Sequence, residues 1–197
     1  MHRPLLIIAA FAGLSVSSAR AEFIVNITQV GNNVIASGSG TIDLTGLTDL
    51  GPGDASPSVA PRVGLIALGV AGDTEIYTGF TGPSSFGSGA VTHATTAAGD
   101  TVGIDDDTNY LAVPPGFVSG GSLSGTATFD NTTLAGLGLT PGQYVYSWNT
   151  PDDSFVVNVV PSTTPPPVGV PEPASLALLG GSLLGCCLVR RRRRTEG

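Results

Sequence analysis

Hydrophobic and polar residues alternate with a period of two along much of the chain. Leu123, Gly125, Ala127 and Phe129 alternate with serine, threonine and aspartate, which is the pattern of a β-strand with one buried face. The same alternation runs over residues 34–44. Apolar and β-branched residues predict further strands, which cover residues 23–30, 63–70, 74–80, 143–148 and 154–160.

These short segments predict an all-β domain over residues 22–160, because no segment sustains the stripe of an amphipathic helix. About seven or eight strands separated by Gly, Pro and Asp turns are typical of an antiparallel β-sandwich or a jelly-roll-like domain. Residues 48–62 and 81–101 are rich in Gly, Ser, Pro and Thr, and we expect them to form long surface loops. A Pro-rich linker over residues 161–170 follows the domain.

Three aromatic residues, Tyr144, Tyr146 and Trp148, share one face of the predicted strand 143–148. The preceding Leu-Thr-Pro-Gly resembles the turn before a tyrosine corner, in which a tyrosine hydroxyl bonds to upstream backbone. As core or corner residues, the three rings would hold the domain together. As an exposed row they would stack on sugar rings and make the domain a carbohydrate-binding module.

Residues 1–21 have the organisation of a secretory signal peptide. A weakly basic start precedes an apolar run over residues 5–16, which is too short to cross a bilayer. Ala19 and Ala21 form an A-x-A cleavage site. We therefore expect the chain to be exported and its mature form to begin at Glu22.

Residues 171–197 have the organisation of a membrane anchor. An uncharged apolar segment, residues 174–189, would form one short transmembrane helix of about 24 Å against about 30 Å of hydrocarbon. The motif before it consists of Val170, Pro171, Glu172 and Pro173. The basic stop after it consists of Arg190, Arg191, Arg192, Arg193 and Arg194. Since arginines stay on the cytoplasmic side, we expect a cytoplasmic C-terminus and a domain outside the inner membrane.

The order of proline motif, apolar helix and arginine run over residues 169–194 resembles the PEP-CTERM sorting signal of Gram-negative bacteria. The resemblance implies that the export machinery and a membrane-embedded exosortase are partners of this chain. It also implies cleavage near residues 171–173, after which the exterior part is released or attached at the cell surface. Many bacteria with such signals make exopolysaccharide, which is a further implied partner. A permanent single-span anchor is the alternative.

Charge and cysteine content narrow the classes of partner. Residues 22–170 contain 13 acidic residues and one basic residue, Arg62, a formal charge of about −12. Such a domain repels nucleic acid and anionic lipid, so we expect neither as a direct partner. Both cysteines, Cys186 and Cys187, lie in the predicted anchor. The exported domain therefore has no disulfide and depends on its hydrophobic core.

Few residues of this domain are suited to catalysis. His93 is its single histidine, and no nucleophile-elbow motif accompanies it. A zinc site would need three or four His or Cys ligands, which the domain lacks. We expect no enzymatic activity, with a secreted hydrolase that uses His93 or a pair of aspartates as a minor alternative.

One acidic stretch follows part of a calcium-binding pattern. Asp105, Asp107 and Asn109 match the D-x-D-x-N start of a calcium loop. Tyr110 and Gly116 stand where an EF-hand has glycine and glutamate, so an EF-hand is rejected. A looser calcium site in a β-loop and a solvated acidic turn are the two alternatives, and we expect no other cofactor.

Together these features predict a secreted surface or extracellular-matrix protein, structural or adhesive in a polysaccharide-rich envelope or biofilm. The biofilm setting follows from the family resemblance. A carbohydrate-binding module is the main alternative.

Overall fold

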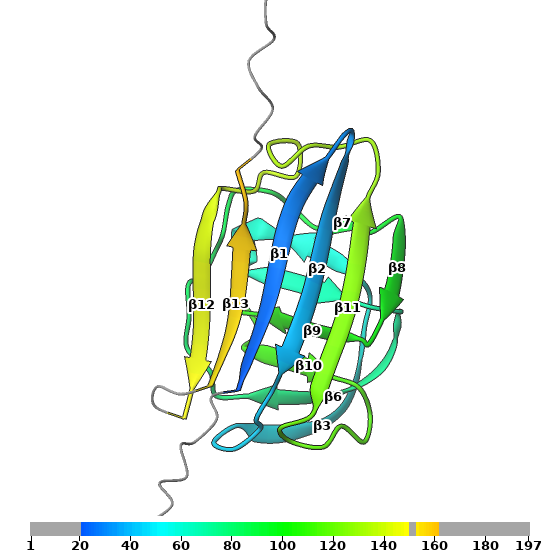
Figure 1. The fold of residues 1–197 in the computed structure, drawn as a ribbon. Coiled ribbons are helices and arrows are strands. Elements are labelled where there is room, and N and C mark those ends of the chain that lie inside the picture. The colour runs from blue at the N-terminus through cyan, green and yellow to red at the C-terminus, as the bar shows by residue number, and fades with distance from the viewer. Residues whose placement is uncertain (1–20, 150–152, 162–197) are drawn as a thin grey trace, which may run out of the picture. The chain divides into compact units, whose positions relative to one another are not determined.

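The computed structural model describes residues 21–149 and 153–161, and these form two β-sheets that enclose one core (Figure 1). The predicted all-β fold is confirmed for this part of the chain, which contains no α-helix. The predicted linker over residues 161–170 and the helix over residues 174–189 lie outside it, apart from Pro161.

The first sheet has six strands and carries the long alternating segments of the sequence. In spatial order they are β12 (Gly142–Trp148), β13 (Asp153–Val159), β1 (Glu22–Val30), β2 (Asn33–Thr41), β11 (Ser122–Phe129) and β8 (Thr96–Gly99). All neighbours are antiparallel except β1 and β13, which are parallel. The predicted antiparallel β-sandwich is therefore confirmed in part, with this one pair of parallel neighbours as the difference. Parallel neighbours need a long connection, here the chain from β2 to β12, which alternation within single strands does not reveal.

The second sheet has seven strands, which cross behind those of the first sheet in Figure 1. In spatial order they are β3 (Thr48–Ala55), β6 (Gly72–Thr78), β10 (Tyr110–Val113), β9 (Val102–Asp105), β5 (Leu65–Leu68), β4 (Ser58–Ala60) and β7 (Thr92–His93). A short 3₁₀ helix, η1 (Pro61–Val63), joins β4 to β5. All neighbours in this sheet are antiparallel.

The predicted loop over residues 48–62 is wrong, because it contains β3, β4 and η1. Gly51, Pro52 and Gly53 lower strand propensity, but β3 lies at the sheet edge, where a proline is tolerated. The predicted loop over residues 81–101 holds the short strands β7 and β8.

The two sheets approach closely where the inward positions are glycines. Gly38 on β2 and Gly125 on β11 are register partners, and Leu68 of the second sheet packs against both. A Cβ atom on Gly38 would lie 2.6 Å from Leu68 Cδ1, which is closer than van der Waals contact. The glycines in the alternating pattern thus accommodate a side chain of the opposite sheet.

Thr74 on β6 is a buried polar residue, and its burial costs stability. Its side chain is 1% exposed and its Oγ1 has no hydrogen-bond partner. We expect Thr74→Val to raise the free energy of unfolding by about 1 kcal/mol, because it removes an unsatisfied hydroxyl while keeping the shape.

Urea denaturation of the purified mature protein measures this effect. Thr78→Val is the matched control, since the Thr78 hydroxyl donates to Asn109 Oδ1 at 2.7 Å and its removal should destabilise the fold. A loss of stability in Thr74→Val would contradict the prediction.

Candidate functional site

The predicted sorting residues, Val170 to Pro173 and Arg190 to Arg194, lie outside the described residues, as does Ala19. Ala21, the last residue of the predicted signal peptide, is described and buried. Its N–H donates to Asp153 Oδ1 at 3.4 Å, and its carbonyl accepts from Ser154 N at 3.0 Å. Cleavage after Ala21, as predicted, would remove both of these contacts.

The aromatic face of β12 is structural. The Tyr144 hydroxyl donates to the Thr140 carbonyl at 2.9 Å, which confirms the predicted tyrosine corner. Tyr146 is fully buried, and the Trp148 Nε1–H donates to the Asp43 carbonyl at 2.7 Å. An exposed row of three rings for stacking on sugars was therefore the wrong alternative.

Burial also sets the ionisation of Tyr146. The loss of hydration raises the pKa of its hydroxyl far above the ordinary value, and the negative charges of Asp106 and Asp105 add to this rise. The Tyr146 hydroxyl donates to the Gly64 carbonyl at 3.3 Å. It serves as a neutral hydrogen-bond donor in the core.

Hydrogen bonds to the Asp105 carboxylate hold the acidic loop between β9 and β10. Asp105 Oδ1 accepts from Asp107 N at 3.2 Å, and Asp105 Oδ2 accepts from Thr108 Oγ1 at 2.9 Å. These bonds hold the turn closed.

Asn109 ties this loop to the end of β6 instead of facing a cation. Its Oδ1 accepts from Thr78 Oγ1 at 2.7 Å and from Gly79 N at 2.8 Å, while its Nδ2 donates to the Phe80 carbonyl. Its φ of 56° is left-handed, which asparagine tolerates. Within the described residues, no group of three His, Cys, Asp or Glu side chains could hold a metal ion. The contacts favour the acidic turn over the calcium site.

Asp106 in the same turn is a partly buried carboxylate between two others. Desolvation raises its pKa above the ordinary value, and the charges of Asp105 and Asp107 raise it further. The folded state therefore binds this proton more tightly than the unfolded state. The resulting stability is present below the ordinary pKa and is lost as the pH rises through the raised pKa.

We expect Asp106→Asn to stabilise the protein by about 0.5 kcal/mol at neutral pH, because the amide carries no charge to desolvate or repel. The gain should vanish near pH 3, where the carboxyl group of the wild type is protonated. Urea denaturation at both pH values measures the difference, with Asp130→Asn as the control at an exposed and distant carboxylate. Equal or lower stability of Asp106→Asn at neutral pH would refute this account.

The outer face of the second sheet carries a groove of about 320 Å³. Its floor consists of small residues that are register partners on adjacent strands, namely Ser58, Ala67, Gly103 and Ala112. The neighbouring residues on these strands, including Ile66, Ile104 and Leu111, point into the core. The small side chains of Ser58, Ala67 and Ala112, together with Gly103, therefore leave a groove on the outer face of the sheet.

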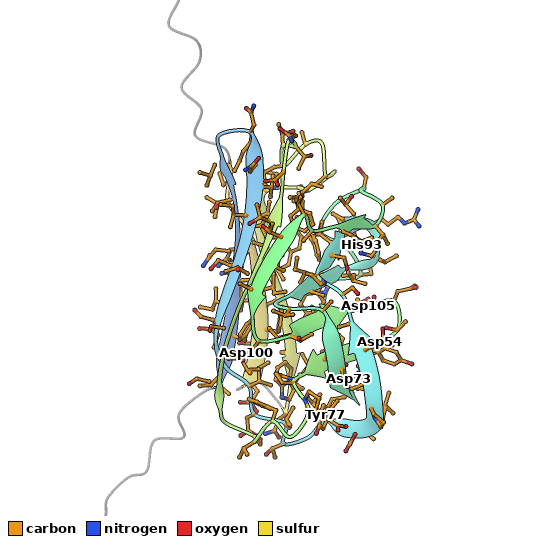
Figure 2. All side chains as sticks on the ribbon, turned by 90° about the vertical axis from the view of Figure 1, so that its right-hand side faces the viewer. Asp54, Asp73, Tyr77, His93, Asp100 and Asp105 are labelled. Atoms are coloured by element: carbon orange, nitrogen blue, oxygen red, sulfur yellow. The ribbon has the colours of Figure 1, made fainter. Side chains whose placement is uncertain are left out.

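Polar and aromatic side chains border this groove, and they come from different strands. Asp54 lies on β3, His93 on β7, Asp105 at the end of β9 and Tyr110 at the start of β10. Figure 2 shows Asp54, Asp105 and His93 on the side of the second sheet that faces away from the first. His93 and Asp105 were candidate functional residues from the sequence, whereas Asp54 and the small residues of the floor were not.

The groove does not contain a hydrogen-bonded catalytic triad. His93 is exposed and is the cross-strand partner of Ser58, whose hydroxyl donates to the Ser56 carbonyl at 3.0 Å. Among the described residues, no hydrogen bond joins the His93 imidazole to a hydroxyl or a carboxylate. The hydrolase alternative therefore gains no support from this geometry.

Comparison with known proteins adds one finding at the C-terminal end. Residues 169–194 match the family model described as the PEP-CTERM protein-sorting motif. The chain carries a PEP-CTERM sorting motif. The motif indicates export and sorting to the cell envelope by exosortase. Neither the curated proteins nor the solved structures contain a match to the chain.

The PEP-CTERM match spans the predicted motif, the apolar segment and the arginine run, so the predicted identity of this region is confirmed. Within residues 21–149 and 153–161, no helix is long and apolar enough to cross a membrane. The predicted span over residues 174–189 lies outside the described residues.

Proposed function

We propose that the exterior domain is a non-enzymatic structural or adhesive component of a polysaccharide-rich envelope or extracellular matrix, such as a biofilm, in a Gram-negative bacterium. The observation that carries this proposal is the PEP-CTERM motif at residues 169–194, because it directs the chain to the envelope. After processing, only the β-domain and its linker remain to act there.

The properties of the β-domain support this role. It has an extensive hydrophobic core and no disulfide. Its described part contains twelve acidic residues and one basic residue, Arg62. A strongly negative surface favours solubility and keeps copies of the domain apart. These properties suit a domain that is displayed in a hydrated matrix.

Deletion of the protein from its host tests the role. The deletion strain should lose cohesion of its extracellular matrix, measured as the shear needed to disperse attached cells. The wild-type chain should restore cohesion, and a chain with alanine at residues 171–173 should not. Unchanged cohesion in the deletion strain would contradict a structural or adhesive function.

A separate experiment tests whether the domain has enzymatic activity. We expect the purified mature protein to leave the chain length of the host exopolysaccharide unchanged, as measured by size-exclusion chromatography. If the protein shortens the polysaccharide, the His93→Ala variant shows whether the groove is the active site. Such shortening would replace the structural proposal with the hydrolase alternative.

A further inference from the structure

We infer that the groove on the outer face of the second sheet binds a glycan segment that carries amino groups. This inference rests on the proposed function, since it names the class of matrix molecule that the domain would hold. The proposed saccharide site lies on the second sheet, whereas the buried aromatic residues of β12 belong to the first sheet.

The shape of the groove suits the flat face of a sugar ring. Ala67, Gly103 and Ala112 form a floor without long side chains. Gly103 cannot be larger, because a Cβ atom there would lie 2.7 Å from the Ile66 carbonyl oxygen. The volume of about 320 Å³ is at the lower end for small-molecule sites, so it suits a short stretch of a saccharide chain.

Tyr110 supplies the aromatic surface that such a ligand needs. It lines the groove and is 43% exposed, although it lies at the start of a strand whose next three residues are buried. An exposed aromatic ring beside an apolar floor can stack on the C–H face of a pyranose.

The polar groups at the border are mainly hydrogen-bond acceptors. The Asp54 carboxylate accepts no hydrogen bond from the described residues, and the Asp105 carboxylate accepts two within the turn. An ionised carboxylate offers about four acceptor positions. Hydroxyl and ammonium donors of a ligand would satisfy the remaining ones.

Charge complementarity selects amino sugars over acidic sugars. Asp54 and Asp105 line the groove, and Asp106 and Asp107 follow Asp105 in the turn. No Lys or Arg of the described chain lines the groove. A uronic-acid chain would meet like charges at each side, whereas an ammonium group would be attracted.

Titration calorimetry of the full mature protein with a glucosamine tetramer tests the inference. We expect this probe to bind at least tenfold more tightly than the N-acetylated tetramer or a galacturonic-acid tetramer, and to weaken as salt is added. Equal affinity for all three tetramers, or no binding of the glucosamine tetramer, would overturn the proposed site.

Matched variants locate the binding. Tyr110→Ala and Ala112→Leu should each lower the affinity at least tenfold, the first by removing the ring and the second by filling the floor. Asp54→Asn should lower it severalfold, whereas Asp73→Asn should change it less than twofold, because Asp73 lies opposite Asp54 but does not line the groove. Unchanged thermal unfolding shows that a variant is folded. Wild-type affinity in a folded Ala112→Leu variant would place the ligand elsewhere and refute the inference.

The deletion strain and the binding assay together separate this inference from the proposed function. Unchanged cohesion in the deletion strain, although the purified wild type binds the glucosamine tetramer, would argue against the structural role alone. Loss of cohesion in the deletion strain without any glucosamine binding would argue against the groove alone.

Discussion

Replacing Pro171, Glu172 and Pro173 by alanine should leave the precursor uncut in the inner membrane. These residues form the start of the matched sorting motif, so their removal should prevent recognition by exosortase while the apolar segment and the arginines still hold the chain. We expect at least a tenfold fall in protein outside the inner membrane. Cell fractionation with immunoblotting measures this distribution.

The matched control replaces Pro165, Pro166 and Pro167, which lie upstream of the match. It removes a similar number of prolines and should leave processing intact. Normal release of the 171–173 variant would show that these residues do not direct sorting. Retention of both variants would point to a need for a stiff linker instead.

Phe155→Ala should lower the free energy of unfolding by about 3–5 kcal/mol, which is a large part of the stability of a single domain. Phe155 is fully buried on β13, between β12 and β1, and its ring centroid lies 5.2 Å from that of Phe23. The substitution leaves a cavity between the two sheets, and without a disulfide no cross-link limits the loss.

Chemical denaturation followed by Trp148 fluorescence measures this change, since Trp148 is the single tryptophan and is buried. Val145→Ala on β12 is the control, because Val145 is 45% exposed and should contribute less than about 0.5 kcal/mol. A loss below about 1 kcal/mol in Phe155→Ala would contradict the described core.

The first sheet was largely predictable from sequence, whereas in the second sheet only β5 and β6 were, as the predicted strands 63–70 and 74–80. Strands β1, β2, β11, β12 and β13 have seven to nine residues, long enough for alternation to show. By contrast, β9 and β10 have four residues each, too short to display a clear period. Strand β3 contains Gly51, Pro52 and Gly53, so local propensity opposed a strand that pairing with β6 stabilises.

The same distinction between local and non-local information applies to the functional residues. The PEP-CTERM motif and the tyrosine corner lie within short continuous stretches, so both could be predicted. The groove depends on the register of β4, β5, β9 and β10, which brings small residues together from positions 58 to 112. No short window of sequence contains that arrangement.

Asn109 shows why a motif alone was insufficient to identify a calcium site. The spacing of Asp105, Asp107 and Asn109 is that of a calcium loop, and hydrogen bonds within the protein use side-chain oxygen atoms of Asp105 and Asn109. Only the position of β6 beside the turn reveals that the Asn109 amide holds the two elements together.

We propose that this chain is exported, cut at its PEP-CTERM motif and delivered to the envelope. The intact mass and cellular location of the wild-type protein in its native host report on all three steps. We expect a product outside the inner membrane that lacks residues 1–21 and everything beyond a cut near residues 171–173. A product in the inner membrane that still carries Arg190 to Arg194 would contradict it.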